Sequence, residues 1–189
     1  TRILSNIKDV DYLTPIAELA QQQAGGVDVV TLNYDLTIER MAARCGVPVH
    51  RAIEDWRSGQ SLEYAAGDGA INLYKIHGSL DWLFVPPGDP VKAATIEVDS
   101  SSAGESRARG AAPWIVVGDR EKLATEGPTL ELLRSAEEAL SRSTDLLVVG
   151  YSFADMHVNR MIRNWMLASP DRNIGVLDLS WSQPNSDPD

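Results

Sequence analysis

Cysteine is nearly absent from this chain, since Cys45 is the only one among its 189 residues. A single cysteine cannot form a disulfide within the chain, and it cannot build a zinc site of several cysteines. The three histidines are scattered along the sequence. We therefore predict that the chain binds no metal and, in particular, no structural zinc. A chain without internal disulfides fits a cytoplasmic location.

The chain also lacks any apolar run of about 18 residues, which is the length that a membrane-spanning helix needs. Residues 1–6 do not show the basic-then-apolar pattern of a signal peptide, and the chain begins with Thr1 rather than with Met. We therefore expect no membrane partner. We also expect the sequence to be a processed or excised piece of a longer protein.

Basic residues are outnumbered, because 17 Lys and Arg stand against 27 Asp and Glu, for a formal net charge of -10. Proteins that bind nucleic acid neutralise phosphates with clustered basic side chains, and here the basic side chains are dispersed. Direct binding of nucleic acid is therefore not expected. A dinucleotide ligand is not excluded, because backbone N–H groups and helix N-termini hold a pyrophosphate without any net positive charge.

What the chain does contain is an alternation of helical and strand patterns, which predicts a layered α/β domain with a parallel sheet. Its length and its hydrophobic content of 43% suit one globular domain, and we expect residues 1–189 to form it. The expected helices cover about residues 11–23, 35 or 37–46, 50–59, 130–140 and 156–166. The expected strands cover residues 27–32, 71–76, 114–117, 146–150 and 173–179.

Residues 86–113 differ from the rest in composition, because Pro, Gly, Ser, Ala and charged residues dominate them. A segment of this kind buries too little apolar surface to order itself, which predicts one long flexible loop inserted in the domain. The α/β pattern resumes after it, so the loop is not a domain boundary. The tail, residues 180–189, is polar with two prolines and is expected to fray.

Polar residues follow three of the expected strands, at residues 31–35 (TLNYD), 75–79 (KIHGS) and 150–155 (GYSFAD). In an open α/β sheet, ligands bind beyond the carboxyl ends of the strands. Each segment alone also has a purely structural interpretation: a turn with a helix cap, a structural histidine, and a tight strand-to-helix turn. One segment by itself would favour the structural interpretation.

Taken together and in this order, the three segments resemble the prokaryotic sirtuin-like domain family. TLNYD is similar to the catalytic Asn motif of that family, KIHGS to its catalytic His motif, and VVGYSFADMHVN to its Gly-Tyr-Ser-Phe segment. The resemblance spans residues 27–179. It implies a Rossmann-like α/β fold of three layers, with helices on both faces of a parallel sheet.

The chain departs from this family pattern in two places. The family begins with a strand and a glycine-rich turn, Gly-Ala-Gly-Xaa-Ser, that cradles the pyrophosphate. No such sequence precedes Asp11, so we expect this first strand to lie upstream of Thr1 or to be lost. Sirtuins that deacylate proteins carry a four-cysteine zinc module, which Cys45 alone cannot build. In this respect the chain resembles bacterial defence-associated members, which implies NAD hydrolysis.

The resemblance implies a role for eight residues. Asn33 and His77 would be catalytic, Asn33 by orienting a water or the ribose hydroxyls and His77 as the general base, which suits a side chain with a pKa near neutrality. Asp35 would bind the carboxamide of nicotinamide, and Gly150 would let the ribose and phosphates approach closely. The helix that begins near Asp155 would direct its N–H groups at the same ligand. The six residues that would bind NAD are Thr31, Asp35, Gly78, Gly150, Tyr151 and Ser152.

The function that the resemblance implies is an NAD glycohydrolase of a bacterial antiphage defence protein, which uses NAD as its substrate and releases nicotinamide and ADP-ribose. Two alternatives remain open: a non-catalytic domain that senses NAD or an ADP-ribose derivative, and an NAD-dependent protein deacylase. The resemblance also implies a larger parent protein with a partner domain, or a homo-oligomer. Because the glycine-rich turn is not found, we expect this chain by itself to hydrolyse little or no NAD.

Overall fold

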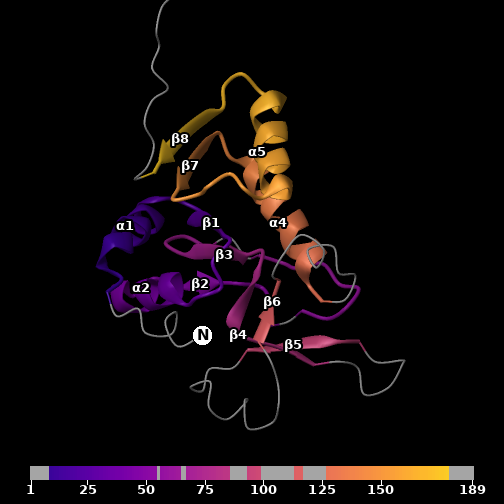
Figure 1. Cartoon of the computed structure of the whole chain (residues 1–189). Coiled ribbons are helices and arrows are strands. Elements are labelled where there is room, and N and C mark those ends of the chain that lie inside the picture. Colours follow the sequence, from indigo (N-terminus) through magenta and orange to yellow (C-terminus); the bar gives the residue numbers. More distant parts are fainter. Residues whose placement is uncertain are drawn as a thin grey trace, which may run out of the picture. The chain divides into compact units, whose positions relative to one another are not determined.

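The computed structural model describes residues 9–54, 56–64, 67–85, 93–98, 113–116 and 127–178 (Figure 1). The chain divides into two compact units, Thr1–Ala136 and Glu137–Asp189, and each is described by itself. Both contain parallel strands with helices between them. The fold is therefore a mixed α/β architecture, compatible with the Rossmann-like fold that the sequence predicted. Within the described ranges, no helix has the length and apolar character that crossing a membrane requires.

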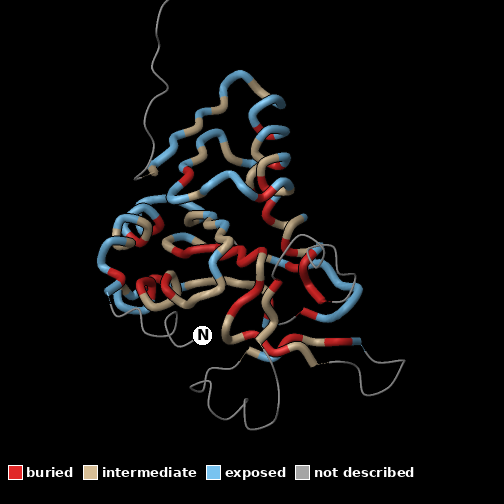
Figure 2. The backbone as a smooth tube through the Cα atoms, in the orientation of Figure 1, coloured by how far each residue is buried: buried red, intermediate tan, exposed pale blue. Residues whose placement is uncertain are grey.

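A parallel sheet of three strands forms the centre of the first unit. Its strands are β1 (Val27–Thr31), β3 (Ile71–Lys75) and β2 (Val49–His50), with β3 in the middle. β3 is buried along its whole length (Figure 2), as expected for the central strand of a parallel sheet. Thr31 lies opposite Lys75 in the register, so β1 and β3 end level. The segments that follow these two strands therefore leave the sheet at the same edge.

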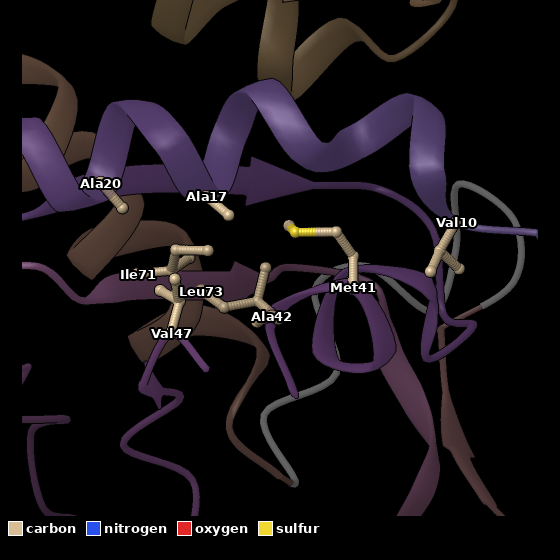
Figure 3. Close-up of a cluster of buried hydrophobic side chains, with 8 residues drawn as sticks. All are labelled: Val10, Ala17, Ala20, Met41, Ala42, Val47, Ile71 and Leu73. Atoms are coloured by element: carbon tan, nitrogen blue, oxygen red, sulfur yellow. The ribbon is translucent and has the colours of Figure 1, made fainter. Parts of the chain in front are cut away.

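Two helices cover one face of this sheet. A short 3-10 turn, η2 (Asp11–Leu13), leads into α1 (Thr14–Gln22), and α2 (Thr37–Cys45) ends just before Gly46. Figure 3 shows the side chains of both helices directed at β3, where small alanines let the backbones approach closely. The buried core consists of Val10, Ala17, Ala20, Met41, Ala42, Val47, Ile71 and Leu73. Both predicted helices are confirmed to within a residue or two.

An antiparallel sheet follows directly in the chain, and the sequence did not predict it. β4 (Gly78–Val85) lies between β5 (Thr95–Val98) and β6 (Pro113–Ile115). The expectation that 86–113 is one continuous loop is therefore wrong at β5, which gains its strand conformation by pairing with β4. Residues 86–92 and 99–112 lie outside the described part of the chain. The strand predicted at 114–117 is found as β6, but it pairs antiparallel with β4 instead of extending the parallel sheet.

The helix predicted over residues 50–59 is also wrong. Val49 and His50 form β2, and the following residues make turns, apart from residue 55, which is not described. Ala52 has a φ of 55°, which a right-handed helix does not allow. The Arg51 guanidinium donates to the Glu54 carboxylate at 2.9 Å and closes the turn instead. Pairing of β2 with β3 thus outweighs the local helical pattern.

The second unit repeats the strand–helix–strand pattern. β7 (Asp145–Val149) and β8 (Asn173–Leu177) pair in parallel, and α5 (Met156–Ala168) connects them. α5 buries Val158, Met161 and Trp165, which is the stripe that its spacing predicted. α4 (Thr129–Arg142) precedes β7 and includes the last residue of the first unit. The strand predicted to reach 179 ends at 177, and the expected fraying of 180–189 falls outside the described residues.

Candidate functional site

The first predicted motif forms the turn between β1 and α2. The backbone N–H of Asn33 donates to Thr31 Oγ1 at 3.1 Å, and the backbone N–H of Thr37 donates to Asp35 Oδ1 at 2.9 Å. The side chains of Thr31 and Asp35 thus shape this turn and hold the start of α2. Asn33 itself is exposed, so its amide can reach a ligand.

The second motif forms the tight turn between β3 and β4. His77 is half-buried there, and its carbonyl accepts a hydrogen bond from Val116 N at 3.0 Å. Gly78 has a φ of 83°, and a Cβ atom placed on it would lie 2.1 Å from the carbonyl oxygen of Trp114. Close approach of β6 therefore explains the glycine, which the sequence had assigned to ligand binding.

Hydrogen bonds join these two turns on both sides of their central residues. Ile76 N donates to Thr31 O at 3.3 Å, and Leu80 N donates to Tyr34 O at 2.9 Å. One bond precedes Asn33 and His77 in the chain and the other follows them both. The structure therefore places the Asn33 turn and the His77 turn against each other, where β1 and β3 end level.

A buried lysine adds a third link, which was not predicted from the sequence. The Nζ atom of Lys75 donates to the carbonyl of Asp35 and, at 2.9 Å, to Glu39 Oε1. Lys75 is fully buried. The available signal was a lysine in the run INLYKI, because a charged residue among apolar strand residues needs a buried partner.

A second charged network fixes the start of β4. The guanidinium of Arg51 lies 2.9 Å from Asp81 Oδ2, and the hydroxyl of Ser79, which is fully buried, donates to Asp81 Oδ1 at 2.5 Å. Burial lowers the pKa of Arg51, but the charges of Glu54 and Asp81 raise it and prevail. The network holds the chain immediately after Gly78.

The third motif lies in the second unit, in the turn between β7 and α5. The Tyr151 hydroxyl accepts from Asp155 N at 3.2 Å and lies 2.9 Å from Asn159 Oδ1, to which it can donate. Its ring contacts Phe153, with ring centroids 4.8 Å apart. Tyr151 thus builds the turn, whereas Gly150 and Ser152 are exposed. A Cβ placed on Gly150 would meet no atom within 4 Å, so the space in front of it is open.

The N-terminus of α5 carries the predicted side-chain cap. Asp155 Oδ1 accepts from His157 N at 2.9 Å and from Val158 N at 3.2 Å, so the predicted helix cap is confirmed. The same bonds occupy N–H groups that were expected to face a phosphate, and they place a carboxylate at that helix end. That the other N–H groups of this helix end face the ligand stays a prediction.

The eight predicted site residues fall into two groups. The first unit brings together Thr31, Asn33, Asp35, His77 and Gly78, and the second unit brings together Gly150, Tyr151 and Ser152. In the part of the chain that the structure describes, no three His, Cys, Asp or Glu residues are arranged to hold a metal ion.

Comparison with known proteins adds family evidence to this geometry. A search of the curated proteins finds no match to the chain. The family model described as SIR2-like domain matches residues 27–187, which include the turns at Asn33, His77 and Gly150. The match covers most of the 189 residues, begins at the same residue as the motif resemblance and extends eight residues beyond its end at 179. The chain therefore belongs to the SIR2-like domain family.

Proposed function

We propose that this chain supplies the catalytic domain of an NAD glycohydrolase, which cleaves NAD to nicotinamide and ADP-ribose. Membership of the SIR2-like domain family indicates an NAD-related function. The observation that carries the proposal is the pair of hydrogen bonds from Ile76 and Leu80, which fix the Asn33 turn against the His77 turn. The residues that carry an amide and an imidazole then lie in neighbouring turns at one edge of the sheet.

The reaction needs few groups from the protein. As the nicotinamide–ribose bond breaks, its electron pair leaves with neutral nicotinamide, and positive charge develops on the ribose. A water oxygen then bonds to the ribose carbon and must lose a proton. His77 would accept that proton, or one from a ribose hydroxyl, as the general base. The His77 residue is half-buried at this turn.

Two neighbouring side chains complete the proposed site in the first unit. The exposed amide of Asn33 would orient the water or the ribose hydroxyls, since it offers both a donor and an acceptor. Asp35 already accepts from Thr37 through Oδ1, so the carboxamide of nicotinamide would bind through Oδ2. Thr31 would act by shaping this turn, because its hydroxyl accepts from Asn33 N.

In the second unit, Gly150 and Ser152 remain proposed contacts for the ribose and phosphates of NAD. Both are exposed, and open space lies in front of Gly150. Tyr151 would contribute by holding their turn in place. We further propose that residues 1–189 act as one domain, in the cytoplasm, within a larger bacterial defence protein or a homo-oligomer.

The test measures nicotinamide release by the protein in its full natural length. His77→Ala should lower turnover by about 100-fold or more, because the general base is lost. His50→Ala is the matched control, since His50 is also half-buried but pairs with Asn72, three residues before the end of β3. We expect it to stay within about twofold of wild type. Full activity of a folded His77→Ala variant would contradict the mechanism, and NAD binding without turnover in the wild type would favour the sensor alternative.

A further inference from the structure

Lys75 is the least expected residue of the parallel sheet. It is fully buried on β3, although lysine is almost never fully buried without a partner. Its ammonium group binds two acceptors: the backbone carbonyl of Asp35 and, at 2.9 Å, the carboxylate of Glu39 in the first turn of α2. The lysine therefore joins the strand that leads to His77 to the turn that carries Asn33.

Stability alone is a poor explanation for this ion pair. Replacing a buried pair with apolar side chains often leaves stability unchanged or raises it, because removing two charges from water costs more than their attraction returns. Here the cost is only partly offset, since Glu39 Oε2 is buried and forms no hydrogen bond. The buried Lys75–Glu39 pair is therefore better explained by a role in positioning the residues around it.

We propose that Lys75 is a positioning residue that sets the Asn33 turn relative to His77. Two backbone bonds already hold this turn at Thr31 and Tyr34, but neither restrains the carbonyl of Asp35. Lys75 supplies that restraint from a position two residues before His77, and Glu39 orients its ammonium group. Its effect on catalysis rests on the proposed function, whereas its effect on the turn does not.

The decisive variant removes the link without leaving a buried charge. Lys75→Met together with Glu39→Met replaces both charged side chains with apolar ones of similar size, so we expect a folded protein with a melting temperature near that of the wild type. Lys75→Met alone should be less stable, because Glu39 then keeps a buried charge without a partner. If the double methionine variant does not fold, Lys75→Met with Glu39→Gln also removes the bond to the Asp35 carbonyl and leaves no buried charge.

The first readout is independent of NAD chemistry. Amide hydrogen exchange of the peptide that covers residues 32–36 should become about tenfold faster or more in the double variant, because the turn opens more easily. Peptides from α1 and β8 should exchange as in the wild type. Unchanged exchange at residues 32–36 would overturn the proposal whatever the activity of the protein.

The second readout is NAD turnover in the full-length protein. Misplacing reacting groups by about 1 Å can cost about 100-fold, so we expect kcat to fall by about 10- to 100-fold with a smaller change in KM. A wild-type kcat in a double variant whose turn exchanges faster would overturn the positioning role. If the wild type releases no nicotinamide, the proposed function fails, and the exchange measurement still decides whether Lys75 holds the turn.

A matched control removes a different ion pair from the same helix. Arg44 of α2 lies 3.0 Å from Asp11, with both side chains more than half exposed. Arg44→Met with Asp11→Asn should therefore change neither exchange at residues 32–36 nor kcat. A similar loss of kcat in this control would show that any ion-pair removal from α2 disturbs the site, and the specific role of Lys75 would be overturned.

Discussion

Two glycines with similar backbone angles lie in very different surroundings, and alanine should separate their roles. Gly78 has a φ of 83° and Gly150 a φ of 61°, which an alanine tolerates poorly in both cases. A Cβ on Gly78 would lie 2.1 Å from the Trp114 carbonyl oxygen, whereas a Cβ on Gly150 would meet nothing within 4 Å. Gly150→Ala therefore measures the cost of the backbone angle, and Gly78→Ala measures that cost plus a steric clash.

The magnitudes follow from these two terms. An L-residue in the left-handed region costs about 1–2 kcal/mol, which is the loss expected for Gly150→Ala. Overpacking costs about 1–3 kcal/mol more, because β6 must move to accommodate the new methyl group. The free energy of unfolding should thus fall by roughly 2–5 kcal/mol in Gly78→Ala.

Urea unfolding of both variants, followed by circular dichroism, tests this reasoning. If Gly78→Ala loses no more stability than Gly150→Ala, the close contact between β4 and β6 does not explain Gly78, and its assignment to ligand binding regains support. Nicotinamide release provides the complementary measurement, because a methyl group in the open space at Gly150 should raise KM for NAD if the ligand passes there.

Three further predictions concern the second unit and metal content. Tyr151→Phe keeps the ring but leaves Asp155 N without its acceptor, so the free energy of unfolding should fall by about 1–3 kcal/mol; a raised KM at full stability would instead make Tyr151 a ligand contact. Hydrogen bonds from Thr144 and Asn173 hold the pKa of Asp145 below its ordinary value of 3.8. The ionised Asp145 carboxylate therefore stabilises the second unit above pH 3.8, and this stabilisation is lost as the pH falls through the lowered pKa. Asp145→Asn should weaken the dependence of the unfolding free energy on acid pH, and an unchanged dependence would contradict the stabilising role of Asp145. Purified protein should contain no stoichiometric zinc by elemental analysis, and unfolding on addition of a chelator would show the opposite.

Local patterns were sufficient for the elements that depend on local chemistry. The apolar stripe and the Asp155 cap predicted α5, and the β-branched run predicted β1, because both signals lie within a few neighbouring residues. β5 could not be found in the same way. Residues 95–98 lie in a segment whose composition is typical of a loop, and they become a strand by pairing with β4. Long-range pairing likewise decided His50, whose partner on β3 is 22 positions away in the chain.

The sequence selected candidate residues for the site, but it did not show which of them shape the turns. Motif order selected Asn33 and His77, and the structure shows that their turns are joined by backbone hydrogen bonds. The sequence could not show that Gly78 faces a carbonyl of β6, because that contact depends on an antiparallel sheet it did not reveal. The role of Lys75 was hidden for a similar reason: its acceptor is a backbone carbonyl 40 positions earlier in the chain.

The hydrogen bonds within each unit distinguish two kinds of residue: those whose side chains hold the backbone of a turn, and those whose side chains the turn exposes. Thr31 and Tyr151 use their hydroxyls to hold the backbone of their own turns. A hydroxyl that satisfies a backbone N–H is costly to redirect to a ligand, because the N–H would lose its acceptor. Asn33 and Ser152, in contrast, are exposed at the tips of these turns. Specificity for NAD should therefore depend on the presented side chains, and substitutions at the building residues should act on them through the shape of the turn.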